Sequence, residues 1–199
     1  MKAASFIMLV ACGALAGCAA LGKADKPVTM RLSPGFPTAT PDLPGSIAVA
    51  PVQARGVTAA LRYAYIDSAA PGEIRQAASL FWEEPPPRVI ERALVAGLKT
   101  RFVTVSGPAV PVPADQRIAI VLTRFEEAGA GGAARAVVAF DATVVKDGKI
   151  TRSGSFCGSM PIDTASATLR ARAFEGAIGT AVEGVVQLMA TGSAPAPAC

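Results

Sequence analysis

The stretch "ARAVVAFDATVVKDGKITRSGSFCGSM", residues 134–160, decides the fold class of this chain. Two β-rich runs, 134–145 and 149–160, flank the dipeptide Asp147-Gly148. Asp-Gly between two such runs is a strong hairpin signal, because a tight type I′ turn needs a positive φ at both central residues. The stretch therefore predicts two antiparallel strands.

Other strands are expected on the N-terminal side of this hairpin. Residues 116–125 alternate Ile118, Ile120 and Leu122 with more polar or smaller side chains, which is typical of a half-buried strand. Further strands are predicted at 28–32, 46–52, 57–66 and 101–105, and residues 67–80 are predicted to form an irregular, partly helical connection.

Two helices complete the pattern. The first opens in "EEPPPRVIERALVAGLKTRF", residues 83–102, because prolines are tolerated in a first helical turn. The second covers about 165–190 with apolar residues at helical spacing, and Gly192 ends it. Runs of strands without strict βαβ alternation indicate an α+β fold. We expect a mostly antiparallel sheet with two main helices packed on one face.

The N-terminus has the pattern of an export signal. Residues 3–17 carry no charge and are too few to span a bilayer, which takes about 20 residues, but they suit a signal peptide. Leu15-Ala16-Gly17-Cys18 is similar to the bacterial lipoprotein signal, and that resemblance makes Cys18 the acylated first residue of the mature chain. The alternative is an ordinary signal peptide with Cys18 as a bystander. Ala19, in place of Asp, favours the outer membrane by resemblance to known sorting rules.

Length and composition set the domain organisation. The 199 residues suit one domain and a processed N-terminus. We predict a signal peptide at 1–17, a lipid-anchored, Pro-rich tether with a short early strand at 18–45, and a single α+β domain at 46–192. Residues 193–199 form an Ala/Pro tail that ends in Cys199.

The cysteines allow one internal pair. Cys12 leaves with the signal peptide and Cys18 is acylated, so Cys157 and Cys199 remain. Leftover cysteines in an oxidising periplasm tend to pair, and this pair would staple the tail to the domain. The alternative is a buried Cys157 with a free or intermolecular Cys199.

The chain contains no histidine, which excludes Ser-His-Asp and Cys-His catalysis and the common His-containing zinc sites. The net charge is +4, but the Lys and Arg residues are scattered along the sequence and form no run, so no nucleic-acid surface is expected. The glycine-rich residues 129–134 precede a strand and not a helix, so they indicate a loop and not a dinucleotide site. Three serines, Ser153, Ser155 and Ser159, lack an activating histidine. We expect no catalytic residue, no metal and no cofactor.

Phe81 and Trp82 lie just before the first predicted helix. Trp82, the one tryptophan, either covers the core under the start of that helix or anchors a protein–protein interface, where Trp is favoured. Tyr65, Phe81 and Trp82 are therefore candidate partner contacts.

The order of these features resembles a known family. A lipobox precedes "VTMRLSP" (28–34), a strand at 47–52, a tyrosine-containing strand ending in Asp67, and a Trp shortly before "RVIERALVAGL" (88–98). This pattern is similar to the ABC-type transport auxiliary lipoproteins, which include the lipoprotein of the Pqi system.

The resemblance implies a non-enzymatic lipoprotein on the periplasmic face of the outer membrane. It would dock a periplasm-spanning assembly of Mce-domain protein and ABC permease that moves lipid or another hydrophobic compound, and a homo-oligomeric ring is one arrangement it implies. Two other interpretations stay open. One is a periplasmic carrier that holds lipid itself, which needs a sizeable apolar cavity, and the other is a histidine-free hydrolase.

Overall fold

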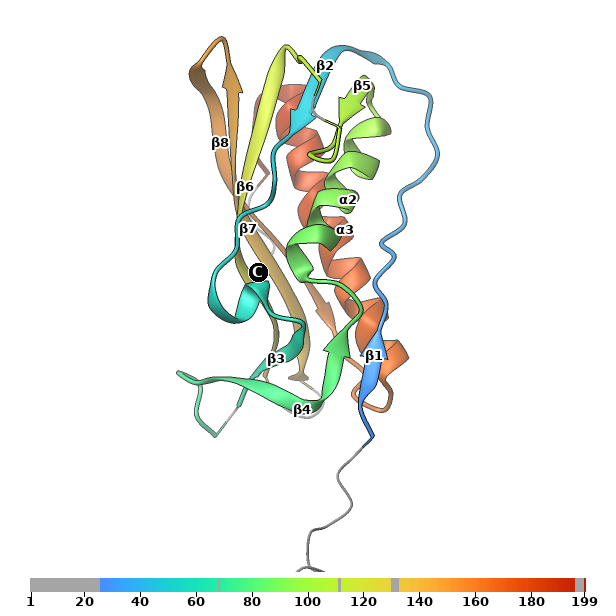
Figure 1. The fold of residues 1–199 in the computed structure, drawn as a ribbon, viewed down its shortest axis with the longest axis vertical. Helices are drawn as coiled ribbons and strands as arrows, with labels where there is room; N and C mark the ends of the chain where they lie inside the picture. The colour runs from blue at the N-terminus through green and yellow to red at the C-terminus, as the bar shows by residue number, and fades with distance from the viewer. Residues whose placement is uncertain (1–25, 68, 111, 130–132, 196–198) are drawn as a thin grey trace, which may run out of the picture.

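The computed structural model describes residues 26–67, 69–110, 112–129, 133–195 and 199, and in them an eight-stranded sheet is covered by two helices on one face (Figure 1). The elements in chain order are β1 (Val28–Met30), β2 (Leu43–Val49), the short 3-10 helix η2 (Gly56–Ala59), β3 (Arg62–Ile66), β4 (Ile74–Trp82), α2 (Pro86–Lys99), β5 (Phe102–Ser106), β6 (Gln116–Ala128), β7 (Arg135–Lys146), β8 (Lys149–Pro161) and α3 (Ala167–Thr191).

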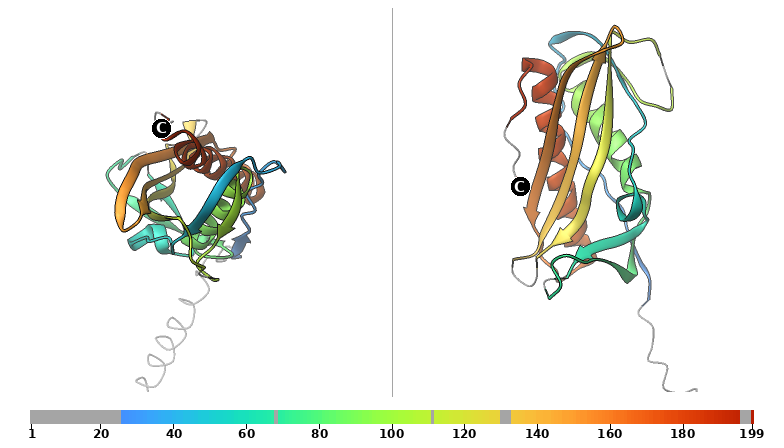
Figure 2. Two further views of the ribbon diagram at one scale, coloured as in Figure 1. Left: turned by 90° about the horizontal axis from the view of Figure 1, so that it is seen from above. Right: turned by 90° about the vertical axis from the view of Figure 1, so that its left-hand side faces the viewer.

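The predicted hairpin of β7 and β8 forms one edge of the sheet, because β8 pairs with β7 alone. Its turn holds Asp147 at φ 51° and Gly148 at φ 74°, which confirms the Asp-Gly signal. β7 pairs antiparallel with β8 on one side and with β6 on the other, each along nearly its whole length. Figure 2 shows these three long strands side by side.

The other edge of β6 is shared by β2 and β3. β2 runs parallel to the first part of β6, Gln53 bridges to Val121, and Tyr65 of β3 pairs with Glu127 near the end of β6. β5 extends the sheet beyond β2, and β4 and β1 extend it beyond β3. The sheet is mixed, but its long ladders are antiparallel, so the predicted α+β class with a mostly antiparallel sheet is confirmed.

Both predicted helices are present. α2 starts at Pro86 and α3 starts after Ser166, whose hydroxyl accepts the amide of Leu169 at 3.2 Å. Gly192 ends α3 with φ 80°, a conformation that costs glycine little. α3 lies directly on the C-terminal part of β8, where a Cβ at Gly158 would overlap the carbonyl oxygen of the Ala177 backbone.

Two strand predictions are wrong. Residues 67–80, expected to be an irregular and partly helical connection, contain most of β4, which pairs with β3 at Ile66 and Ile74 and with β1 at Met30 and Trp82. Their sequence lacks clear alternation, and the strand depends on these distant partners. The strand expected at 57–66 begins only at Arg62, because residues 56–59 form η2.

The predicted tether boundary at residue 45 is also too late. Met30 and Leu32 are buried in the core, and β1 and β2 are strands of the sheet. Residues 28–45 therefore belong to the folded domain, although the prolines keep the stretch between β1 and β2 free of regular structure. Within the part of the chain that the structure describes, no helix has the length and apolar character to cross a membrane.

Candidate functional site: the anchor strap, the tail and a groove beside α2

Cys18, the candidate lipidation site, lies outside the described residues, as do the signal peptide and the first part of the tether. The described chain begins at Lys26, at the end of the domain where β1 and β4 lie (Figure 1). We call residues 26–42 the anchor strap. Its first step is β1, which pairs with the end of β4, and the amide of Glu83 donates to the carbonyl oxygen of Met30 at 2.8 Å.

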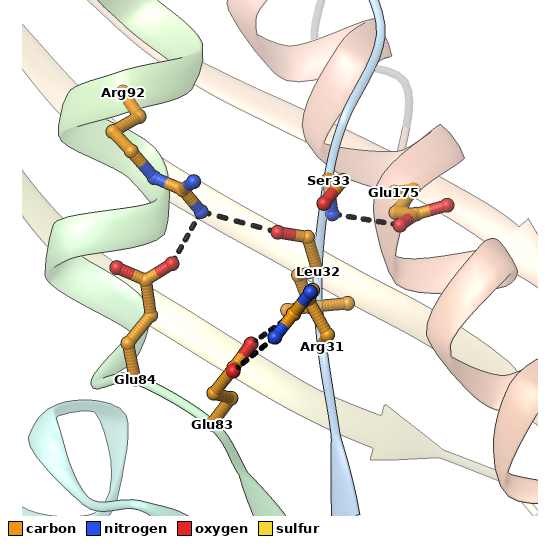
Figure 3. Close-up of polar contacts among 7 residues, drawn as sticks. All are labelled: Arg31, Leu32, Ser33, Glu83, Glu84, Arg92 and Glu175. Atoms are coloured by element: carbon orange, nitrogen blue, oxygen red, sulfur yellow. Dashed lines mark hydrogen bonds and ion pairs between the residues drawn. The ribbon is translucent and has the colours of Figure 1, made fainter.

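An ion pair between Arg31 and Glu83 joins the strap to the segment just before α2 (Figure 3). Nε of Arg31 lies 2.5 Å from Oε2 of Glu83, and Nη2 lies 2.6 Å from Oε1. The hydrogen bond from Arg31 lowers the pKa of Glu83. Both side chains are largely exposed, so this two-point contact orients the strap and adds little stability.

Two further contacts tie the strap to both helices (Figure 3). Nη2 of Arg92 in α2 donates to the carbonyl oxygen of Leu32 at 3.1 Å, and the same nitrogen binds the carboxylate of Glu84. The amide of Ser33 donates to Oε1 of Glu175 in α3 at 2.7 Å. Strap backbone groups are thus satisfied by side chains from both helices.

Apolar contacts seal the strap between the helices. Leu32 is 2% exposed, and the ring of Phe36 rests against Gly97 of α2. A Cβ at Gly97 would come within 2.6 Å of Cγ1 of Val182 and 3.2 Å of Cε1 of Phe36. Gly97 therefore lets α2, α3 and the strap meet at one point.

The far end of the strap is fixed to the segment after α2. Nε of Arg101 lies 2.7 Å from Oδ1 of Asp42, and the amide of Leu43 donates to the carbonyl oxygen of Arg101 at 2.8 Å. The hydrogen bond from Arg101 lowers the pKa of Asp42. The strap is held at both ends, so a force on its N-terminal side is transmitted to the sheet and to both helices.

Trp82 does not form an exposed partner contact, which corrects that part of the prediction. It is 3% exposed and lies against three aromatic rings, with centroid distances of 5.3 Å to Tyr63, 5.4 Å to Phe125 and 5.0 Å to Phe174. Because rings at these distances bury large areas, these residues form the core at this end of the domain. The structure supports the other role, covering the core at the start of α2.

The two remaining candidate contacts are separate from each other. Tyr65 is half-buried at the margin of the core, whereas Phe81 is half-buried with the guanidinium of Arg62 5.6 Å from its ring centroid. Neighbouring residues of a strand point to opposite faces, so Phe81 points away from Trp82. These side chains do not make a single patch.

A polar chain lies beside the aromatic core. The hydroxyl of Tyr63 donates to the carboxylate of Glu127, whose Oε2 also lies 3.3 Å from Nε of Arg170. Burial, and then the hydrogen bond to Glu127, raises the pKa of Tyr63. Sequence reasoning missed this contact, because its members come from β3, β6 and α3.

In the structure, Cys157 and Cys199 are joined by a disulfide, with Cα atoms 5.7 Å apart and a sequence separation of 42. The tail also packs on the domain before it reaches the disulfide. A Cβ at Gly154 would lie 3.2 Å from that of Ala194, and one at Gly184 would lie 3.4 Å from the ring of Pro195. The absence of a side chain at Gly154 and Gly184 therefore leaves room for the tail to pack between β8 and α3.

Two of the three serines of β8, Ser155 and Ser159, contact charged side chains. Oγ of Ser155 donates to Oδ1 of Asp141 at 2.6 Å, and Nε of Arg135 donates to Oγ of Ser159 at 2.7 Å. Among the described residues, no three Cys, Asp or Glu side chains cluster as metal ligands would.

A groove of about 360 Å³ lies between α2 and the chain that follows β5. α2 lines one side of it with Val95, Ala96, Arg88, Arg92 and Lys99, and residues 107–109 line the other side. Sequence reasoning missed it, although a signal was present. Residues 102–114, "FVTVSGPAVPVPA", form a run without any charge in a chain that is 17% charged.

The fold is an α+β domain with a mixed sheet and two helices. The anchor strap packs against both helices, and the C-terminal tail is joined to β8 by the disulfide. Several solved structures, including the following three, are similar to this domain. Protein XCC0632 from Xanthomonas campestris, described with the family model DUF330, has 21% identity and a TM-score of 0.71, with 81% of this chain and 94% of that chain covered.

An uncharacterized protein has 14% identity and a TM-score of 0.66, with 83% of this chain and 99% of that chain covered. The hypothetical protein CT253 from Chlamydia trachomatis has 9% identity and a TM-score of 0.50, with 73% and 97% covered. At these identities the similarity shows the fold alone. No protein-family model and no curated protein sequence matches the chain.

Proposed function

We propose that this protein is a non-enzymatic lipoprotein, anchored by acylated Cys18 on the periplasmic face of the outer membrane. It docks a periplasm-spanning Mce-type and ABC-permease assembly that moves lipid or another hydrophobic compound. The lipobox Leu15-Ala16-Gly17-Cys18 supports the anchor, and several acyl chains give stable membrane attachment where one chain is marginal. The transport role rests on the family resemblance, which covers residues 15 to about 190 and is most specific over residues 63–98.

The strap is the observation that carries this proposal. Only seven residues separate Cys18 from Lys26, and an extended chain gains at most about 3.6 Å per residue, so the strap end of the domain lies within about 30 Å of the lipid. From there Leu32 is bonded to Arg92 of α2 and Ser33 to Glu175 of α3, so a pull on the strap acts on both helices. A domain that holds a partner assembly to a membrane needs such a connection.

The packed interior favours docking over the carrier interpretation. A carrier needs an apolar cavity large enough for an acyl chain. At the strap end, the space between the sheet and α3 is filled by Tyr63, Trp82, Phe125 and Phe174, whose ring centroids lie 4.9–5.7 Å apart. This arrangement supports a role in which the cargo passes through a partner.

Affinity purification from native membranes tests the proposal. A C-terminal tag would disturb the tail, so we place the tag in the exposed β7–β8 turn at Asp147-Gly148. The expected result is co-purification of an Mce-domain protein with the wild-type chain and its loss with Cys18→Ala, which cannot be acylated. Recovery of the wild-type chain without any Mce-domain protein, from membranes whose other envelope complexes stay intact, would contradict the transport role.

A further inference from the structure

The groove beside α2 has the form and charge of a peptide-binding site. α2 supplies one wall, in which Arg88, Arg92 and Lys99 are spaced 4 and 7 residues apart and so share a face with Val95. Residues 107–109 supply the other wall, and Gly107 lies close to Val95 because its added Cβ would come within 3.3 Å of Cγ2 of Val95. The α2 side of the groove therefore combines basic and apolar side chains, and the side formed by residues 107–109 carries no charge.

The surface charge of the basic wall is positive, although two carboxylates also line the groove. Glu91 accepts the amide of Val52 at 2.9 Å and has a side chain only 8% exposed beneath Arg88, which is 60% exposed. Glu84 binds Arg92 and is the less exposed of the two. In each pair the arginine is the more exposed partner, and Lys99 adds a third positive charge to the same face of α2.

Exposed apolar side chains also occur in the segment that lines the uncharged side of the groove and in the strand before it. Val103 and Val110 are 69% and 67% exposed, and no charged residue lies between Arg101 and Asp115. Clustered exposed apolar residues mark interaction sites on soluble domains. β5 and the C-terminal end of α2 lie toward the opposite end of the domain from β1 (Figure 1), so the Lys99 end of the groove lies away from the start of the strap.

We propose that the groove between α2 and residues 107–109 binds a segment of a partner protein that presents an apolar stripe with acidic residues along one flank. The apolar stripe seats on Val95, Ala96 and Pro108, and the acidic flank meets Arg88, Arg92 and Lys99. An amphipathic helix laid in a groove is a recurrent mode of this kind. This inference takes one point from the proposed function: that the domain has a protein partner in the periplasm.

Site-specific photo-crosslinking of the full chain in its native cells tests the inference. A benzoylphenylalanine replaces Ala96 or Ala109, both exposed groove residues, or Ala119, a control exposed on β6. The expected result is a crosslinked protein from positions 96 and 109 at least five-fold above position 119. Mass spectrometry should place the crosslink in an apolar segment that carries Asp or Glu. Lys99→Glu should lower the yield at least five-fold, and Lys149→Glu, at the exposed hairpin, should not.

Several results would overturn the inference. They are crosslinks at position 96 no stronger than at position 119, and attachment to lipid or to a second copy of this chain. A captured segment without acidic residues, or a crosslink yield that Lys99→Glu does not change, would do the same.

The further inference and the proposed function can fail independently. An acidic apolar segment from a protein outside any Mce assembly keeps this inference and removes the transport role. Co-purification of an Mce-domain protein without crosslinks at 96 does the reverse.

Discussion

The amide of Ser33 donates a 2.7 Å hydrogen bond to Oε1 of Glu175, which joins the strap to a helix 142 residues further along the chain. This bond holds the strap against α3 at the point where Leu32 enters the core. Anything that loosens it should free the strap before it unfolds the domain.

Glu175→Ala should therefore expose the strap to protease. A hydrogen bond of this type contributes about 1 kcal/mol, which corresponds to about a five-fold larger open population. Trypsin should cut after Arg31 about five-fold faster than in the wild type, measured as the appearance of fragments that begin at Leu32. Glu175→Gln keeps an acceptor oxygen and should show a smaller change. Equal rates in all three proteins would show that this contact does not hold the strap.

Two glycine substitutions should have opposite effects on stability. One glycine lies at the contact of β8 with α3, and the other lies on a part of α3 with open space around it. Gly158→Ala places a Cβ on the Ala177 carbonyl, 2.8 Å from its carbon, and should lower the free energy of unfolding by at least about 2 kcal/mol. Gly179→Ala, on α3 with no atom within 4 Å of the added Cβ, should raise it by about 0.5–1 kcal/mol. Urea unfolding measures both. A Gly158→Ala protein as stable as the wild type would contradict the close approach of these elements.

The tail disulfide should stabilise the domain by closing a loop of 42 residues. Chain entropy alone predicts about 4 kcal/mol for a loop of this length, and measured values usually fall at about 2–4 kcal/mol. Cys157→Ser, Cys199→Ser and the double variant should all lose the same amount, and wild-type protein should match them in reductant. Free thiols in protein isolated from the periplasm, or variants with unchanged stability, would contradict the pairing.

Tyr63 should make stability sensitive to alkaline pH. Burial and the bond to Glu127 raise its pKa above the ordinary value of 10.0, so the unfolded chain loses this proton at a lower pH than the folded chain. The stabilising contribution is complete below pH 10 and falls as pH rises above it. Tyr63→Phe should cost about 1–2 kcal/mol at neutral pH and flatten the alkaline decline.

Tyr65→Phe is the matched control for that experiment, since no described hydrogen bond involves the Tyr65 hydroxyl, and it should change stability by less than about 0.5 kcal/mol. Chemical unfolding of the three proteins across the alkaline range gives the comparison. An equally steep decline in Tyr63→Phe would assign the alkaline sensitivity to another group.

Local sequence signals were sufficient for the hairpin and the two helices. The Asp147-Gly148 turn, the cap at Gly192 and the apolar stripe of α2 each act within a few residues. β4 could not be predicted in this way, because its residues alternate poorly and it becomes a strand by pairing with β1 and β3.

The candidate site was predictable only in part. The pattern around Trp82 allowed either a core or a surface role, and the choice depended on Tyr63, Phe125 and Phe174, which approach from three other elements. The strap was expected to be a tether because of its many prolines. Its partners Arg92 and Glu175 lie on helices far away in the sequence, and no local pattern points to them. The pairing of Cys157 with Cys199 followed from counting cysteines, and its chemical test is the reductant experiment above.

Lipid attachment at Cys18 is the central claim, and mass spectrometry of the mature N-terminal tryptic peptide tests it most directly. The account predicts a peptide of residues 18–23 that begins at Cys18 and carries a diacylglyceryl group on its thiol, with no peptide from residues 1–17 in the mature protein. An unmodified Cys18, or a mature chain that begins at any other residue, would contradict it.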